Sequence, residues 1–198
     1  KWIYQAVRIL KNTGSIYIAI NVEYAAEYVI KLKQNNLYMR NWIIWYYTFG
    51  EHQNNKFTRS HTHILYFVKA PNNFTFNKDN IRIMSVRQKI GDKRANPKGK
   101  IPDDVWYDSL DDVWEISRVA GTFKERVKGF PCQMPIKLLD RIILASSNEN
   151  DIVLDPFAGS GTTLVVAKMR HRRYIGIEIS PNYVEIAKKR LDDITMLF

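Results

Sequence analysis

The sequence predicts an α/β fold whose sheet is mostly parallel and carries an antiparallel hairpin. The last third of the chain alternates helical and strand patterns, which is typical of parallel strands joined by crossover helices. Two strand patterns at 41–49 and 63–69 are separated by the polar stretch 50–60, as in a long hairpin. A third observation is the β-branched run SIYIAI at 15–20, which stands between two helical patterns.

The bounds of each element follow from hydrophobic spacing and from glycine as a boundary signal. Apolar residues recur at helical spacing through 2–10, and Gly14 ends that pattern. Further helices are expected at 23–35, 135–146, 162–169 and 181–191, and further strands at 152–155 and 173–178. Periodicity is weak over 71–129, so that segment is expected to be irregular.

The composition indicates a cytosolic protein with a polyanionic partner. The 198 residues carry a net charge of +10, and the segment from Arg82 to Lys100 holds seven Lys or Arg against one Asp. This excess of positive charge favours a nucleic acid as the partner, because each phosphate that a cation neutralises releases counterions. The alternative is that the cations lie on solvated loops and keep the protein soluble. The sole cysteine, Cys132, fits a reducing compartment. No apolar run is long enough to span a membrane, and we expect no signal peptide.

A glycine-rich loop, IVLDPFAGSGTT at 152–163, runs from a strand directly into a helix. Its glycines let the backbone turn tightly and approach a ligand, and the helix N-terminus offers unpaired N–H groups. The next strand ends in Glu178, seventeen residues beyond Gly161, where an acid can accept hydrogen bonds from ribose hydroxyls. These features alone fit a dinucleotide-binding enzyme almost equally well.

Two residues favour S-adenosylmethionine over a dinucleotide. The pyrophosphate fingerprint requires a third small residue where the helix packs closely, and Leu164 stands there. Asp155, just before the loop, would repel a pyrophosphate but can pair with an ammonium group. A ligand with a ribose, an ammonium and no phosphate suits both acids, and S-adenosylmethionine is such a ligand. The structural alternative is a packing turn whose glycines serve geometry alone.

The strings DPFAGSGTT and RRYIGIEISPNYVEIAKKRL resemble the cofactor motifs of the amino-group DNA methyltransferases, which methylate adenine N6 or cytosine N4. GFPCQMPIKLLDRII resembles the other cofactor motif of that family, with Phe130 where a histidine often stands. ILKNTGSIYIAI and FTRSHTHILYFVK are similar to its helix-strand segment and its hairpin strand. The motif order resembles the permuted β-class. The resemblance implies a Rossmann-like sheet, S-adenosylmethionine as cofactor, double-stranded DNA as partner, a restriction-modification role in a prokaryotic cytosol, and often a homodimer.

The resemblance also implies three functional parts. Residues 1–69 would belong to the catalytic half, 70–129 would form a basic target-recognition region, and 130–198 would bind the cofactor. The implied cofactor contacts are Asp155, Phe157, Ala158, Gly159, Ser160, Gly161, Thr162, Thr163, Glu178, Ile179, Pro131, Gln133 and Pro135. The expected DNA contacts, most of them to phosphates, are Arg82, Arg87, Lys89, Arg94, Lys98, Arg118, Lys124 and Arg126.

The family's catalytic motif, Asp or Ser followed by Pro-Pro-Tyr, does not occur in the sequence, which contains no Pro-Pro pair. By the family's motif order it would precede Lys1, so we expect the catalytic residues upstream or on a complementary chain. The implied reaction flips the base out of the duplex and transfers the methyl group directly, without a metal. His61 and His63 lack companion ligands at metal-site spacing. The sequence does not distinguish adenine from cytosine as the target base. Three alternative functions also stay open: an inactive DNA-binding relative, a methyltransferase that acts on RNA, and a nicotinamide-dependent oxidoreductase.

Overall fold

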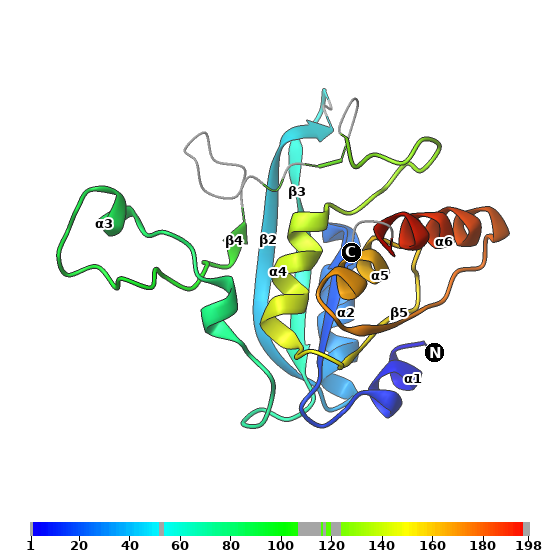
Figure 1. Ribbon diagram of the computed structural model, residues 1–198, viewed down its shortest axis with the longest axis horizontal. Coiled ribbons are helices and arrows are strands. Elements are labelled where there is room, and N and C mark those ends of the chain that lie inside the picture. The colour runs from blue at the N-terminus through cyan, green and yellow to red at the C-terminus, as the bar shows by residue number, and fades with distance from the viewer. Residues whose placement is uncertain (1, 52–53, 107–115, 117, 120–123, 196–198) are drawn as a thin grey trace. The chain divides into compact units, whose positions relative to one another are not determined.

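The computed structural model describes residues 2–51, 54–106, 116, 118–119 and 124–195, and the chain divides into two compact units, Lys1–Glu115 and Ile116–Phe198. The first unit holds a four-stranded sheet (Figure 1), and the second holds a two-stranded sheet. Helices and strands are mixed in both units, so the fold is α/β as the sequence predicts. Within the described residues, no helix is both long and apolar enough to cross a membrane. The functional division at residues 69 and 129 stays a prediction.

The sheet of the first unit has the strand order β1-β3-β2-β4. Its strands are β1 (Ser15–Ile20), β2 (Tyr38–Glu51), β3 (Arg59–Val68) and β4 (Val105–Trp106). Strand β3 pairs antiparallel with β1 on one side and with β2 on the other, and β4 pairs parallel to β2. Because β3 is central, residues 64–68 are all buried.

Two helices, α1 (Trp2–Ile9) and α2 (Val22–Gln34), pack against one face of this sheet. Ile3 of α1 and Leu32 of α2 form a buried cluster with Leu65 and Phe67 of β3. Side chains two residues apart on a strand point to the same face, which explains why Leu65 and Phe67 meet the same helices. Burial of apolar surface at about 25 cal/mol per Å² stabilises this arrangement.

The predicted hairpin is confirmed, and its strands are longer than the sequence indicates. The expected connection 50–60 is shortened because β2 extends to Glu51 and β3 begins at Arg59. The pairing reaches Glu51 opposite Arg59 through an irregularity after Tyr46. Ladder hydrogen bonds join backbone groups, so a strand can continue into polar residues that carry no hydrophobic pattern.

The segment after β3 contains three short elements that lack a recognisable sequence pattern: η1 (Lys78–Ile81), α3 (Val86–Lys89) and β4. We call residues 83–100 the basic arm; it projects to the side of the four-stranded sheet and carries α3 (Figure 1). A bridge between Ile83 and Lys100, with N···O distances of 2.9 and 2.8 Å, closes its base. Gly99 has φ +86°, and a Cβ there would lie 2.4 Å from the carbonyl oxygen of Ile83. The base of the arm therefore requires glycine.

The second unit has the element order that the sequence predicts. Its elements are α4 (Ile136–Ser146), β5 (Ile152–Asp155), α5 (Thr162–Met169), β6 (Arg173–Gly176) and α6 (Pro181–Thr195). Strands β5 and β6 are parallel, in register from Ile152 opposite Arg173 to Asp155 opposite Gly176. Strand β6 ends two residues before the predicted end because its partner β5 ends at Asp155.

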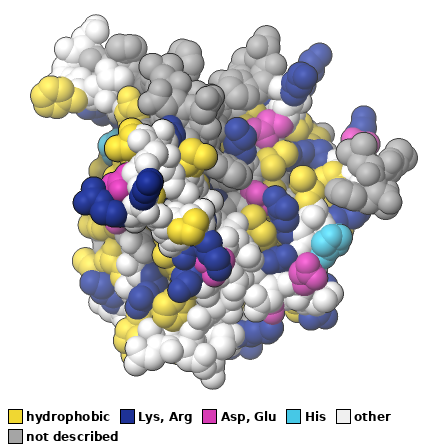
Figure 2. Space-filling model, turned by 60° about the vertical axis from the view of Figure 1, so that its left-hand side comes forward, with side chains coloured by type: hydrophobic (Ala, Val, Ile, Leu, Met, Phe, Trp, Pro, Cys, Tyr) yellow, Lys and Arg dark blue, Asp and Glu magenta, His cyan; other side chains and the backbone are white. Residues whose placement is uncertain are grey.

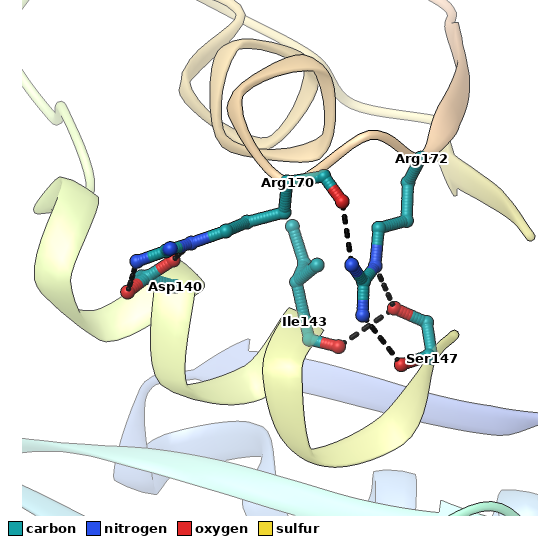
Figure 3. A network of polar contacts seen from close by, with 5 residues as sticks. All are labelled: Asp140, Ile143, Ser147, Arg170 and Arg172. Atoms are coloured by element: carbon teal, nitrogen blue, oxygen red, sulfur yellow. Dashed lines mark hydrogen bonds and ion pairs between the residues drawn. The ribbon is translucent and has the colours of Figure 1, made fainter. Parts of the chain in front are cut away.

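Two arginines join α5 to α4 (Figure 3). The buried guanidinium of Arg172 donates to the carbonyl and hydroxyl oxygens of Ser147, at 2.7 and 3.1 Å, and to the carbonyl oxygen of Arg170 at 2.5 Å. Ser147 and Arg170 are the C-caps of α4 and α5, where the helix dipole favours a cation. The side chain of Arg170 makes two hydrogen bonds with Asp140 of α4, at 2.6 and 2.8 Å. These contacts position α5 and the loop that precedes it.

Candidate functional site

The glycine-rich loop lies at the carboxyl ends of β5 and β6. Gly159 and Gly161 have φ +52° and +75°, in the left-handed region that favours glycine. A Cβ on Gly161 would lie 2.7 Å from the Cβ of Ala187 in α6, and a Cβ on Gly159 would lie 2.7 Å from the ring of Phe130. Both glycines therefore serve the turn and also allow a close approach by another part of the unit.

Asp155 shapes the loop from its first position. One of its carboxylate oxygens accepts a hydrogen bond from the backbone N–H of Phe157 at 3.0 Å, and the other accepts from the hydroxyl of Thr163 at 2.6 Å. A carboxylate can accept about four hydrogen bonds. Asp155 can therefore hold the loop and still offer negative charge to a cationic group of a ligand.

Glu178 connects the end of β6 to the loop. Its Oε2 accepts a hydrogen bond from the backbone N–H of Gly159 at 2.8 Å, and its Oε1 accepts from that of Ser180 at 2.9 Å. The hydrogen bonds from Ser180 and then from Gly159 lower the pKa of Glu178, so its carboxylate is anionic at neutral pH. Both oxygens keep acceptor capacity, which suits the two hydroxyls of a ribose.

Large apolar side chains stand exposed beside these acids. Phe157 is 65% exposed and Ile179 is 97% exposed. Between them in the chain, Ala158 is buried and donates its N–H to the carbonyl oxygen of Ile177 at 3.0 Å, which ties the loop to the end of β6. Apolar surface next to a few fixed hydrogen-bonding groups is the usual lining of a site for a small organic ligand.

Arg190 of α6 holds the loop from its other end, and the sequence reasoning missed it. Its Nη1 donates to the carbonyl oxygen of Ser160 at 2.6 Å and to the hydroxyls of Ser160 and Thr162 at 3.1 and 2.9 Å. Burial lowers the pKa of Arg190, and the charge of Glu125 opposes that shift. Arg190 lies three residues after Ala187, on the same helix face. Amphipathic spacing alone does not reveal that this face contacts the loop.

Pro131, Gln133 and Pro135 belong to the segment that precedes α4. The amide of the buried Gln133 donates to the carbonyl oxygen of Glu125 at 2.6 Å and accepts from the N–H of Val127 at 2.8 Å. Pro135 is buried as the N-cap of α4, whereas Pro131 is exposed. Gln133 therefore orders the backbone of its own segment, and its predicted role toward a cofactor stays a prediction.

Two of the predicted DNA contacts are paired with acids. The Nε of Arg82 donates to Asp79 at 2.6 Å and its Nη1 to the carbonyl oxygen of Gly99 at 2.9 Å, so this side chain braces the base of the arm. Arg94 donates twice to Asp92, at 3.0 and 2.9 Å. These hydrogen bonds from the arginines lower the pKa of Asp79 and of Asp92.

The other predicted DNA contacts are exposed. They are Arg87, Lys89 and Lys98 in the basic arm and Arg118, Lys124 and Arg126 in the second unit. Figure 2, in which the α3 side of Figure 1 comes forward, shows Lys and Arg side chains distributed among apolar ones. Among the described residues, no group of three or more His, Cys, Asp or Glu side chains is arranged to hold a metal ion. The role of these cations toward DNA stays a prediction.

Sequence comparison assigns the family. A model described as DNA methylase, of the N6/N4 methyltransferase type, matches residues 1–189. The type II methyltransferase M.HpaI of Haemophilus parainfluenzae is 43% identical over 194 residues, which cover 97% of this chain and 58% of that protein. The DNA adenine methyltransferase YhdJ of Escherichia coli (strain K12) is 36% identical over 205 residues, which cover 96% of this chain and 66% of that protein.

Solved structures agree with this assignment. The crystal structure of the M1.HpyAVI–SAM complex matches with a TM-score of 0.71 and 27% identity, over 96% of this chain and 80% of that one. The PvuII DNA methyltransferase, described as cytosine-N4-specific, has a TM-score of 0.67 at 17% identity, covers 98% of this chain and 72% of that one, and shows the fold alone. The chain spans about half the length of curated relatives that it matches, with 58%, 44% and 55% for three of them. The chain belongs to the N6/N4 DNA methylase family.

Proposed function

We propose that this chain is the cofactor-binding and DNA-contacting part of a site-specific DNA methyltransferase, which moves a methyl group from S-adenosylmethionine to the exocyclic amine of adenine or cytosine. The observation that carries the proposal is the glycine-rich loop bonded to two strand-end carboxylates, Asp155 and Glu178. Relatives named as type II methyltransferases support a role beside a restriction enzyme in a bacterial cytosol.

The side chains around the loop fit the parts of this cofactor. The anionic Glu178 would accept hydrogen bonds from the ribose hydroxyls, and the exposed Phe157 and Ile179 offer apolar surface to the adenine ring. Asp155 would pair with the ammonium of the amino-acid end. When bound, the cofactor supplies a methyl group on a positively charged sulfur atom, which makes that carbon electrophilic.

The same geometry disfavours a nicotinamide dinucleotide. Asp155 places a carboxylate at the start of the loop, where it would repel a pyrophosphate. In the dinucleotide fingerprint a small residue on the helix allows close packing against the strand. Here the helix carries the buried Leu164, and the small residue is Gly176 on the strand. A Cβ on Gly176 would lie 2.4 Å from the Cδ1 of Leu164, so the close packing depends on the strand glycine.

The contribution of this chain to catalysis would be positioning. Fixing the cofactor so that its methyl group faces the attacking nitrogen removes much of the entropic barrier of a two-substrate reaction. Asp155, Glu178 and the loop would set that orientation, and the exposed cations would hold the duplex from which the base is flipped. The amine-holding Pro-Pro motif is not in these 198 residues, so we expect methyl transfer to require a segment that supplies it.

Ligand binding provides the first test of the proposal. Isothermal titration of this chain should detect S-adenosylmethionine and not NADH. Glu178→Gln should weaken S-adenosylmethionine binding about tenfold, because a hydrogen bond to a charged acceptor is stronger than one to a neutral acceptor. Lys189→Gln, an exposed change on α6, is the matched control and should bind normally. Binding of NADH in place of S-adenosylmethionine would refute the proposal.

Methyl transfer provides the second test. Labelled S-adenosylmethionine and mixed-sequence duplex DNA are incubated with a protein that contains this chain together with a Pro-Pro motif segment, and nucleosides are identified by mass spectrometry. We expect label in N6-methyladenine or in N4-methylcytosine, which also identifies the target base. A protein that binds both S-adenosylmethionine and DNA but leaves both bases unlabelled would be an inactive relative. If a parallel reaction with RNA gives labelled nucleosides and the DNA reaction gives none, the substrate is RNA and the proposal for DNA is wrong.

A further inference from the structure

The basic arm carries three large apolar side chains on its surface. Met84, Val86 and Ile90 are 56%, 70% and 74% exposed. Val86 and Ile90 are four residues apart at α3, so they lie on the same face of its single turn. An exposed apolar surface on an ordered segment is typical of an interaction site. The arm therefore has a binding surface that its own fold does not cover.

Polar contacts, and not these apolar residues, hold the arm in shape. Ser85 and Gln88 form a capping box at α3, with hydrogen bonds of 2.8 and 3.2 Å. The side-chain amide of Gln88 also donates to the carbonyl oxygen of Pro97 at 3.2 Å, across the arm. The bridge of Ile83 with Lys100 closes the base. Because the arm is ordered by these bonds, its apolar side chains can stay directed outward.

Exposed cations lie in the same arm as these apolar side chains. Of the six Lys and Arg residues in the arm, Arg94 and Lys100 form ion pairs with Asp92 and Asp103, and Arg82, just before the arm, pairs with Asp79. The other four are exposed and form no ion pair within the part of the chain that the structure describes; they are Arg87, Lys89, Lys93 and Lys98. A partner that fits this surface must offer both anionic and apolar groups. The DNA major groove offers phosphates at its edges and the thymine methyl group on its floor.

We infer that the basic arm enters the DNA major groove, where Met84, Val86 and Ile90 contact thymine methyl groups while Arg87, Lys89, Lys93 and Lys98 contact phosphates. This inference rests on the proposed function. It assigns discrimination between bases to the apolar residues and the sequence-independent part of the DNA affinity to the cations. It also requires the recognition sequence to contain at least one A·T pair, because only thymine presents a methyl group in that groove.

The experiment compares two classes of variant in the methyltransferase that contains this chain. The methylated sequence is first determined by sequencing DNA modified by the wild-type protein. Affinity for duplexes with and without that sequence is then measured against salt concentration. Ile90→Ser should reduce affinity for the recognition duplex about tenfold, keep the salt dependence unchanged, and relax the methylated sequence at one A·T position. Lys98→Ala should weaken both duplexes equally and reduce the slope of log K against log salt by about 0.9.

Replacing thymine with uracil tests the contact directly, because it removes only the methyl group. Wild-type protein should lose affinity at one or more thymines of the site, and Ile90→Ser should show no loss at the position it governs. Equal binding at every thymine-to-uracil position would overturn the inference, as would a recognition sequence without A·T pairs. Loss of self-association or of vesicle binding in Ile90→Ser, with unchanged DNA preference, would also overturn it. If the wild-type protein methylates no DNA, the proposed function is wrong. If Ile90→Ser methylates DNA with an unchanged sequence preference, only the inference about the basic arm is wrong.

Discussion

Arg172 is a buried cation that donates to helix-terminal carbonyl groups (Figure 3). Replacement by Leu would leave the carbonyl oxygens of Ser147 and Arg170 without this donor, and an unsatisfied buried polar group costs about 1–3 kcal/mol. We expect Arg172→Leu to lower the free energy of unfolding of the second unit by about 2–4 kcal/mol, measured by urea denaturation. Lys189→Leu, an exposed change to the same residue, should stay within about 0.5 kcal/mol of wild type. Equal effects would show that the network contributes little.

His63 makes the stability of the first unit sensitive to pH. It is buried on β3, and its Nδ1 accepts a hydrogen bond from the indole N–H of Trp42 at 2.8 Å. Burial, and then the neighbouring His61, lower the pKa of His63. The unfolded chain, with a histidine pKa of about 6.5, therefore binds this proton more tightly than the folded chain does. Stability is fully present above that pH and decreases as the pH falls through about 6.5 toward the lowered pKa.

We expect the melting temperature of the chain to fall between about pH 7.5 and pH 5.5, the range over which a histidine titrates. His63→Asn, which keeps an acceptor for Trp42 without a titrating ring, should flatten that dependence. His171→Asn is the control, because His171 is exposed and its φ of +58° is one that Asn tolerates. A steep pH dependence that persists in His63→Asn would locate the sensitive group elsewhere.

At the scale of elements, the loop between β5 and α5 depends on Arg190 of α6. Arg190→Met should weaken S-adenosylmethionine binding about tenfold, or about 1.4 kcal/mol, because the carbonyl oxygen of Ser160 and the hydroxyl of Thr162 lose their common donor. Titration calorimetry measures the affinity, and a melting curve shows whether the fold is retained. Lys189→Met is the neighbouring control. Wild-type affinity in a folded Arg190→Met variant would show that the loop keeps its shape without this clamp.

Gly161 in the loop and Gly91 in the basic arm allow the cost of a left-handed backbone to be measured separately from the cost of a steric clash. Gly161 and Gly91 have φ +75° and +72°, but a Cβ would meet Ala187 only at Gly161, since nothing lies within 4 Å of it at Gly91. Gly91→Ala should cost about 1–2 kcal/mol for the left-handed backbone alone. Gly161→Ala should cost about 1–3 kcal/mol more from overpacking, and it should also weaken S-adenosylmethionine binding. Equal costs in urea denaturation would mean that α6 adjusts freely.

At the scale of the whole molecule, two compact units should respond differently to a cofactor. The candidate cofactor site lies in the second unit, Ile116–Phe198. A ligand at 100 times its Kd stabilises the state that binds it by about 2.7 kcal/mol. Hydrogen exchange should therefore slow in α5, β5 and β6 on addition of S-adenosylmethionine and change little in β3. Equal slowing in both units would show that they open as one cooperative body.

The sequence by itself determined the elements whose signals are local. Strands β1 and β5 and helix α5 begin and end at the residues that the pattern predicts, 15–20, 152–155 and 162–169. Each is a short apolar run bounded by glycine or polar residues, so its hydrophobic spacing is complete within the segment. The glycine-rich loop and the acids at both strand ends were also recognisable, because turn geometry and charge depend on the residues themselves.

Only the tertiary structure decided the contacts between residues distant in sequence. It placed β3 between β1 and β2, extended the hairpin into polar residues and brought Arg190 to Ser160 across 30 positions. It also turned the amide of Gln133 toward the backbone of its own segment and bonded Arg82 to Gly99 at the base of the basic arm. A strand can pair with any compatible edge, and a long polar side chain can reach several acceptors. Local periodicity cannot choose among these partners, because packing of the whole unit determines which of them are adjacent.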